Sequence, residues 1–167
     1  MVTVLNRVSD LAWYALHVRS SQERLVTSKL QFDGLDAFYP HYLEKSRDRR
    51  REIDCKFFPG YVFVAADLAR WNLGVAGIPQ IVRIVGNGQT ALPIDEREIE
   101  AIRIMADSPL ASISAPCPFL ETGNKVMITR GAFAGLEGFV VRAGRKAHGV
   151  ISVQALRQSR SIEVSRD

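Results

Sequence analysis

The chain has 167 residues, of which 47% are hydrophobic and 24% charged, and a formal net charge of +4. These values are typical of a globular protein with a core, and the absence of an apolar run approaching ~18 residues excludes a helical membrane span. The modest positive charge permits contact with a polyanion but does not require it. The two isolated cysteines, Cys55 and Cys117, exclude a disulfide framework and a zinc site. The N-terminus makes a poor signal peptide, so we expect a cytoplasmic protein without membrane contact.

The first two thirds of the chain alternate short apolar runs with helical patterns. The run Ala12–Val18 predicts a strand, and the helix after it begins at a serine N-cap, Ser20 or Ser21, and ends at Gly34. The rest of this part is predicted to contain two hairpin arms (36–45 and 51–59), a strand (60–67), a short helix (69–80), a further strand (81–86) and a long helix (93–108).

The sequence pattern changes at "SPLASISAPCPFLETG" (108–123), which contains three prolines and shows no regular hydrophobic period. Short runs rich in valine and isoleucine follow and predict a small β-barrel, at residues 125–129, 138–143, 149–156 and 161–165. We therefore predict an α+β fold of two domains, residues 10–107 and 121–167, joined by a flexible linker at 108–120.

Strand alternation predicts an aromatic face on the first domain. Tyr61 and Phe63 point to one side of their strand, and Trp13 and His17 share that side on the first strand. The intervening valines and leucine are expected to pack under the helices, which leaves few residues to cover the aromatic side. This face is either an exposed protein-binding surface or a surface on which the linker or the barrel packs, and both alternatives remain open.

The hairpin tip is the best candidate for contact with nucleic acid. Arg47, Arg49, Arg50 and Arg51 gather there, and consecutive arginines at a hairpin tip suit phosphate groups better than base edges. Acidic residues interleave with them, so a solvated charged hairpin is the alternative.

The motif "RGAFAGLEGFVV" predicts a structural turn in the barrel. Gly131, Gly135 and Gly138 provide the positive φ angles of a tight turn, while Phe133 and Leu136 would fill the end of the barrel.

An enzyme is not expected. The three histidines lie in different predicted elements, and no serine or cysteine has a partner base at a suitable spacing. No metal-ligand cluster or phosphate-binding glycine loop is present in the sequence, so no cofactor and no metal are predicted.

Four segments stand out in order along the chain. They are "WYALHVRSSQERLVTSKL", "CKFFPGYVFV", "GIPQIVRIVG" and "GNKVMITRGAFAGLEGFVV". In this order the chain resembles the NusG family of transcription elongation factors, and the last segment is similar to the start of a KOW domain. The resemblance is collinear from about Ala12 to Val164, which is nearly the whole chain.

The resemblance implies an N-terminal α/β sandwich tethered to an SH3-like KOW barrel, in a protein expected to be a monomer. It also implies binding to RNA polymerase, suppression of pausing and support of elongation. In such proteins the aromatic face docks on the clamp helices of the largest polymerase subunit. Carried over to this chain, Tyr61 and Phe63 become the anchors, with His17 and Ile84 beside them and Trp13 on the same face.

The second predicted helix is implied to face the other polymerase pincer and the upstream or non-template DNA. The residues that would make this contact are Arg70, Trp71 and Asn72. A specialised branch of the family carries a histidine followed by threonines here, and this chain lacks the threonines. Trp71 packed in the core is the alternative for that residue.

KOW barrels of the family recruit either the termination factor Rho or a small-subunit ribosomal protein. Where the general factor has Ile-Phe-Gly at the docking edge, this chain has Ala155 and Leu156. The chain also stops at Asp167, where relatives run on, which predicts a short last strand or an incompletely closed barrel. These departures favour a specialised paralogue, an antiterminator. The alternative is a KOW-type RNA- or ribosome-binding protein that uses the basic turn at 142–148.

Overall fold

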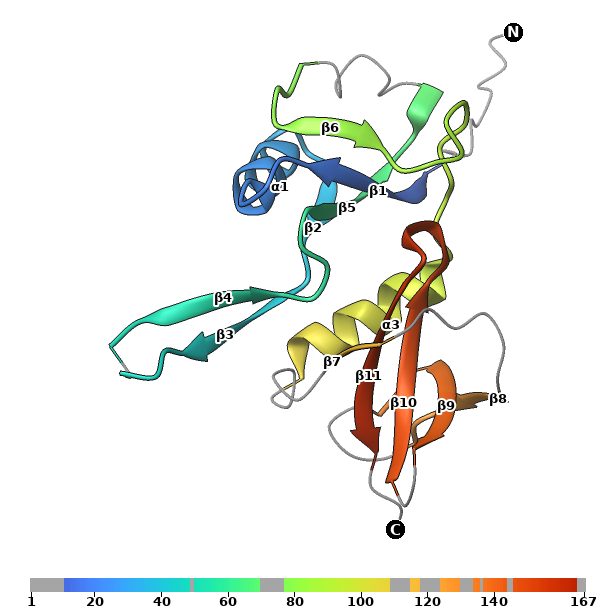
Figure 1. Ribbon diagram of the computed structural model, residues 1–167. Helices are drawn as coiled ribbons and strands as arrows, with labels where there is room; N and C mark the ends of the chain where they lie inside the picture. Colours follow the sequence, from blue (N-terminus) through green and yellow to red (C-terminus); the bar gives the residue numbers. More distant parts are fainter. Residues whose placement is uncertain are drawn as a thin grey trace, which may run out of the picture.

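The computed structural model describes residues 11–48, 50–69, 77–108, 115–117, 124–129, 134–135, 137–143 and 146–164. These residues form an α+β fold, as predicted, with one sheet from the first half of the chain and another from its last third (Figure 1). Within the described residues, no helix combines the length and the apolar character needed to cross a membrane.

The N-terminal sheet has four strands in the order β2-β5-β1-β6. Its strands are β1 (Ala12–Val18), β2 (Asp36–Phe38), β5 (Tyr61–Ala66) and β6 (Ile81–Ile84). The two central strands are antiparallel, and His17 pairs with Tyr61 while Ala15 pairs with Phe63. Since residues directly opposite each other share a face of the sheet, this register confirms that His17, Tyr61 and Phe63 belong to one side.

Helix α1 (Glu23–Phe32) covers the other side of this sheet. Val26 and Leu30 of the helix are buried against Val62 and Val64, as the alternation predicted. The predicted serine cap is wrong, because the N-cap is Gln22 and its side chain makes no capping hydrogen bond. The end of the helix is as predicted. There the chain turns away through Gly34 at φ +81°, a conformation that glycine adopts without strain.

Helix α3 (Glu96–Asp107) lies between the two sheets (Figure 1). It starts later than the predicted residue 93, because the Asp95 carboxylate caps it by accepting a hydrogen bond of 2.8 Å from the N–H of Arg97. Ile99, Ile102 and Met105 are buried along one side, in agreement with their helical spacing.

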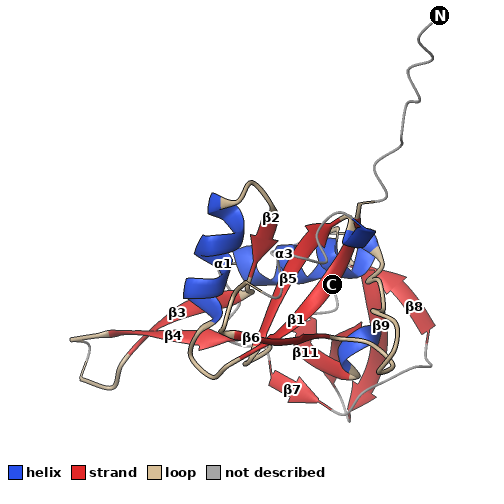
Figure 2. Cartoon of the chain, turned by 90° about the horizontal axis from the view of Figure 1, so that it is seen from above, coloured by secondary structure: helices blue, strands red, loops and turns tan. Residues whose placement is uncertain are grey.

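The predicted hairpin is present but starts later than expected. It consists of β3 (His41–Lys45) and β4 (Glu52–Lys56), which pair only with each other and project away from both sheets (Figures 1 and 2). Residues 36–38, predicted as part of its first arm, instead form β2 at the edge of the N-terminal sheet. Pro40 separates the two segments, since proline has no N–H to continue a ladder.

The C-terminal sheet has five strands in the order β7-β11-β10-β9-β8. They are β7 (Ala115–Cys117), β8 (Asn124–Met127), β9 (Glu137–Ala143), β10 (Lys146–Val153) and β11 (Gln158–Val164). β7 falls in the predicted linker but pairs with β11. The expectation of a short last strand is wrong, because all seven residues of β11 pair with β10. Among the described residues β7 and β8 are the two edges of this sheet and do not pair, so closure of the predicted barrel is not observed.

Candidate protein-binding face

A tight turn positions the aromatic residues that the sequence singled out. Phe57 and Phe58 are buried, and the N–H of Tyr61 donates to the carbonyl of Phe58 at 3.2 Å. Gly60 has φ +82°, which requires glycine at this step, and its carbonyl accepts a 2.8 Å hydrogen bond from the N–H of Val18. The turn is therefore fixed to the end of β1.

A buried ion pair holds the same turn from the helix side. Glu23 at the start of α1 is only 2% exposed, and its carboxylate lies 2.8 Å from the Lys56 ammonium. The other carboxylate oxygen accepts a 2.8 Å hydrogen bond from the N–H of Gly60. Burial by itself raises the pKa of Glu23, but Lys56 and the backbone N–H donors outweigh it and lower the pKa below the ordinary value of 4.5. Glu23 is thus charged at neutral pH and fastens α1 to the turn.

Phe63 is fully buried, so the expectation of an exposed anchor is wrong for this residue. Its ring stacks on Phe38 at 5.5 Å between centroids and meets the edge of Phe58 at 6.0 Å. Trp13 is half-buried and packs edge-on against Phe38 at 5.7 Å. These contacts form one aromatic cluster on the side of the sheet opposite α1.

Arg103 of α3 belongs to this cluster, although no sequence motif points to it. Its guanidinium lies 4.3 Å from the centre of the Phe38 ring and 5.2 Å from that of Trp13. It also pairs with Asp36 at 3.1 Å. The arginine covers the outer edge of the aromatic cluster with a cation, which aromatic faces favour.

Tyr61 and His17 form the half-buried margin of the same face. Their rings are 5.5 Å apart, and a side chain on Gly60 would lie 3.7 Å from the His17 ring. Ile84, predicted to lie beside them, does not: it pairs with Leu16 and packs against the core under α1. The register between β1 and β6 decides this, because cross-strand partners share a face.

Residues of β10 and of the 3-10 helix after it pack on the aromatic face. Ile151, Val153 and Leu156 are buried in the same hydrophobic cluster as Phe57 and Phe63. Of the two alternatives that the sequence left open, packing of the C-terminal part on this face is the one observed. Leu156 was assigned to a docking edge for a further partner, together with Ala155, which is half-buried against the same cluster. Both lie in the short 3-10 helix η2 (Gln154–Leu156).

Arg160 of β11 binds the end of β4 and the turn that follows it. It is 8% exposed, and its guanidinium donates two hydrogen bonds of 2.9 Å, one to the carbonyl of Phe57 and one to that of Lys56. The guanidinium also lies 5.2 Å from the centre of the Phe57 ring. A residue of the C-terminal sheet therefore binds the backbone that leads into the turn. The sequence carries no signal for this, because any arginine can bind a carbonyl.

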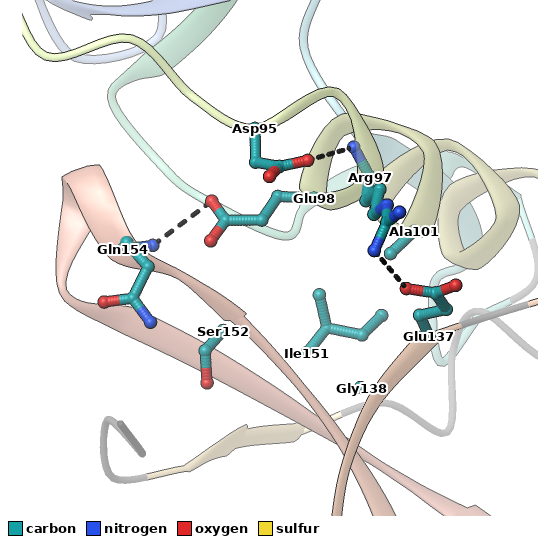
Figure 3. Close-up of a pocket in the computed structure, with 9 residues that line it drawn as sticks. All are labelled: Asp95, Arg97, Glu98, Ala101, Glu137, Gly138, Ile151, Ser152 and Gln154. Atoms are coloured by element: carbon teal, nitrogen blue, oxygen red, sulfur yellow. Dashed lines mark hydrogen bonds and ion pairs between the residues drawn. The ribbon is translucent and has the colours of Figure 1, made fainter. Parts of the chain in front are cut away.

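The border of this contact is polar and open (Figure 3). The Arg97 guanidinium faces the Glu137 carboxylate at 4.0 Å, and the N–H of Gln154 donates to the Glu98 carboxylate at 3.3 Å. Ala101 and Ile151 line the small cavity between them. Its lining provides no set of metal ligands, and in the part of the chain that the structure describes no group of three or more such side chains occurs anywhere.

The hairpin tip holds its arginines on an ordered turn. The N–H of Ser46 donates to the carbonyl of Arg51 at 2.9 Å, and the Asp48 carboxylate accepts from the N–H of Arg50 at 3.1 Å and from the Ser46 hydroxyl. These hydrogen bonds, led by the one from Ser46, lower the pKa of Asp48. Arg47, Arg50 and Arg51 are exposed. The acidic residue at the tip is thus engaged by the turn itself.

The base of the hairpin is tied to α1 through Tyr39. Its hydroxyl donates to the Asp54 carboxylate at 3.0 Å and accepts from the Arg24 guanidinium at 3.2 Å. Arg24 lies 3.5 Å from the same carboxylate. These contacts fix the direction in which the hairpin leaves the sheet.

Several predicted site residues lie outside the described residues. They are Arg49, Arg70, Trp71, Asn72, Gly131, Phe133 and Leu136. Of the glycines in the same predicted turn, Gly135 has φ +88°, and its N–H donates to the carbonyl of Ile128 at 2.8 Å. The positive φ predicted for Gly138 is wrong, because this residue lies within β9 and pairs with Val126 of β8. The positive φ confirms the need for glycine at Gly135.

Comparison with known proteins supports the resemblance seen in the sequence. A family model described as "Transcription termination factor nusG" matches residues 11–103. The transcription termination/antitermination protein NusG of Pseudomonas aeruginosa is 29% identical over 77% of this chain and 79% of its own length. The protein of the same name from Buchnera aphidicola is 23% identical over 91% of both chains.

A solved structure shares the fold. It is described as "Domain interaction in Thermotoga maritima NusG" and is 20% identical to this chain, with a TM-score of 0.51. The alignment covers 92% of this chain and 93% of that one. The similarity therefore extends over both sheets.

Proposed function

The chain belongs to the NusG family of transcription factors, and from this premise we propose that it binds RNA polymerase through its aromatic face and suppresses pausing or termination. The clamp helices of the largest polymerase subunit are the proposed partner. Tyr61, His17 and Trp13 are its proposed contacts, and Phe63 supports them from below. The protein acts in the cytoplasm as a monomer, without cofactor, metal or catalysis of its own.

One observation carries the proposal. The aromatic face of the N-terminal sheet is completed by Ile151 and Val153 of β10 and Leu156 of η2, which lie far along the chain. The N-terminal sheet leaves this apolar face partly uncovered, so another surface has to pack on it. In the free chain the C-terminal sheet does so, and an apolar helical surface of another protein can take its place. Tyr61 and Trp13 are residue types that often dominate such interfaces.

We assign strands β8 to β11 to a KOW domain at residues 121–167 that forms an SH3-like barrel, linked to the N-terminal domain at 10–107 through residues 108–120, which include β7. Its edge at Ala155 and Leu156 recruits a further partner, either a small-subunit ribosomal protein or Rho. The absence of an aromatic ring at this edge favours the ribosomal protein and a specialised antiterminator.

Two further contacts complete the proposal. Arg70, Trp71 and Asn72 face the second polymerase pincer or the upstream DNA. The exposed arginines of the hairpin tip bind the phosphates of upstream or non-template DNA.

A binding measurement with core RNA polymerase from the same source tests the main claim. We expect the full chain to bind and the Tyr61→Ala variant to bind at least about tenfold more weakly, because an aromatic side chain is removed from the interface. Phe32→Ala is the matched control, since this ring is 92% exposed on α1, on the other side of the sheet. Both variants should retain the circular dichroism spectrum of the parent chain.

A transcription assay with the same polymerase then tests for the proposed suppression of pausing or termination. The full chain should shorten pauses or increase read-through of a terminator on a long template. Equal binding by Tyr61→Ala would place the docking site elsewhere. RNA binding with a steep salt dependence, in the absence of any polymerase binding, would favour the RNA- or ribosome-binding alternative.

A further inference from the structure

We propose that the first turn of helix α1 holds the β3–β4 hairpin at two points, and that Tyr39, at the second point, sets the direction in which the hairpin meets DNA. This inference rests on the proposed function, because the contact between the hairpin tip and DNA belongs to it. It goes further in assigning a role to Tyr39, which is a positioning residue for this contact and does not itself touch DNA.

The hairpin is a lever whose free end carries the arginines. Its two strands pair only with each other and project away from both sheets (Figures 1 and 2). At its base the N–H of Phe57 donates to the carbonyl of Pro40 at 3.0 Å. The rise along a strand places Arg51 about 17 Å from Lys56. A pivot of about 20° at the base would therefore move the tip by about 6 Å, which is enough to separate an arginine from a phosphate group.

Two successive residues of α1 hold two alternate residues of β4. Glu23 pairs with Lys56 at 2.8 Å. Arg24, the next residue of the helix, lies 3.5 Å from Asp54. Asp54 and Lys56 project from the same face of β4, because side chains alternate along a strand. A single point of attachment would leave the hairpin able to pivot about it, whereas two points fix a direction.

The second point depends on the Tyr39 hydroxyl. The Arg24 side chain is 69% exposed, so its ion pair with Asp54 contributes little by itself. Tyr39 is buried, and its hydroxyl donates to the Asp54 carboxylate at 3.0 Å and accepts from Arg24 at 3.2 Å. Hydrogen bonds that involve a charged group are among the stronger ones in proteins. Burial raises the pKa of Tyr39 above its ordinary value of 10.0, so the hydroxyl keeps the proton that it donates.

The Tyr39 ring is held in place independently of its hydroxyl. It belongs to the hydrophobic cluster under α1, together with Val26 and Leu30. It also stacks on the His41 ring, with 4.3 Å between the centroids and 14° between the planes. Removal of the hydroxyl alone should therefore leave the ring where it is and release only the hairpin.

A fixed direction matters because the protein is proposed to bind two parts of one complex. The aromatic face docks on polymerase, and the hairpin tip reaches the DNA that the polymerase holds. When both contacts belong to one rigid body, the second forms at a high effective concentration once the first is made, and a pivoting hairpin lowers this concentration. Loss of the Tyr39 hydroxyl should therefore weaken binding only where polymerase and DNA are both present.

Spin-label distances in the free full chain test the direction of the hairpin without any partner. One label replaces Phe32 on α1 and the other replaces Lys45 at the end of β3, both exposed, in a chain whose two native cysteines are changed to serine. The parent should give one narrow distance distribution. Tyr39→Phe should give a broad one, in which the distances spread over about 6 Å or more.

Tyr42→Phe is the matched control. It also removes a tyrosine hydroxyl from the hairpin, but on the face opposite to Asp54, where the Tyr42 ring lies 5.3 Å from that of Phe57. This variant should keep the narrow distribution. A narrow distribution in Tyr39→Phe would overturn the proposal, as would an already broad one in the parent. Equal broadening in both variants would also overturn it, because the effect would not be specific to the second point of attachment.

Binding measurements then test the role in DNA contact. Core polymerase without DNA should bind Tyr39→Phe and the parent equally, since the aromatic face is unchanged. Polymerase on a template with an upstream duplex should bind Tyr39→Phe at least about fivefold more weakly than the parent. Arg51→Gln removes a charge at the tip and should weaken the same complex while its distance distribution stays narrow.

These two variants separate this proposal from the proposed function. If Arg51→Gln weakens binding to the DNA-bound polymerase and Tyr39→Phe does not, the role of Tyr39 is overturned and the DNA contact stands. If neither variant weakens it, the DNA contact of the proposed function fails, and with it the role of Tyr39 in DNA binding. A broad distribution in Tyr39→Phe would then still support the two-point attachment of the hairpin.

Discussion

Phe63 has a structural role in the free chain, whatever it contacts in a complex. It is 0% exposed, stacks on Phe38 and meets Phe58. The family resemblance of "FFPGYVF" assigns Phe63 to partner binding, whereas its packing in the structure makes it a core residue. The two roles are compatible, because a ring that supports the face from below shapes the surface on which a partner docks.

Phe63→Ala should therefore lower the free energy of unfolding by about 3–5 kcal/mol, since it removes a buried ring and leaves a cavity. Urea denaturation followed by fluorescence measures this. Phe32→Ala, at an exposed position on α1, should change the same quantity by less than about 0.5 kcal/mol. A Phe63→Ala chain as stable as the parent would show that the aromatic cluster does not contribute to the core.

Glu23 links the pH dependence of stability to the turn. Its pKa is lowered in the folded chain, so its ion pair with Lys56 contributes fully above the ordinary value of 4.5. This contribution is lost as the pH falls from 4.5 through the lower folded value, where the carboxylate takes up a proton.

In Glu23→Gln we expect this pH dependence to be reduced, together with a loss of about 2 kcal/mol near neutral pH, since a hydrogen bond to a charged group is broken. Unfolding free energies measured between pH 7 and roughly pH 3 test both effects. If the variant and the parent lose stability in parallel as the pH falls, another carboxylate is responsible.

At the scale of elements, the β3–β4 hairpin projects away from both sheets (Figure 1). It pairs with neither sheet, and Leu43 and Ile53 are exposed along it. Contacts of Tyr39 with Asp54 and Arg24 anchor its base, while hydrogen bonds of Ser46 order its tip. A two-stranded ribbon of this kind has the right width for the major groove of DNA, or it can follow the phosphates beside it.

Changing Arg47, Arg50 and Arg51 together to glutamine should weaken binding to duplex DNA at low salt. The slope of log affinity against log salt should fall by roughly 0.9 for each phosphate group that the variant no longer binds. Fluorescence anisotropy at several salt concentrations measures both quantities. The corresponding lysine variant keeps the charges and should bind nearly as well as the parent. Equally weak binding by the lysine variant would point to bidentate contacts with bases instead.

At the scale of the whole molecule, the packing of α3 and the C-terminal sheet against the N-terminal sheet determines how compact the chain is. Leu156 is buried in the contact, whereas Arg97 and Glu137 lie at its open border. The apolar centre should therefore control closure, and the ion pair at the border should not.

Leu156→Asp should open the chain and raise its radius of gyration in small-angle X-ray scattering, because a charge cannot be buried beside Phe57 and Phe63 without a large cost. Arg97→Ala should leave the radius of gyration unchanged. An expansion in Arg97→Ala but not in Leu156→Asp would mean that charge, not apolar contact, holds the sheets together.

Local pattern by itself determined several of the elements and the family. Ala12–Val18 is a strand with the bounds that its composition predicts, and α3 lies within the helix predicted at 93–108, because strand alternation and helical spacing depend on near neighbours. The hairpin was predictable for the same reason. The turn at Gly60 was also predictable, since only glycine accepts its backbone angle without strain.

Only the tertiary structure decided which faces are covered. Phe63 is buried by residues far along the chain. Ile84 lies on the side of the sheet that α1 covers, because β6 pairs with β1 in that register. Arg160 contributes to the packing because two backbone carbonyls lie within hydrogen-bond distance of it. Alternation tells which side chains share a face, but not what packs on that face. Coverage depends on contacts between segments distant in sequence, and these leave no mark in the local pattern.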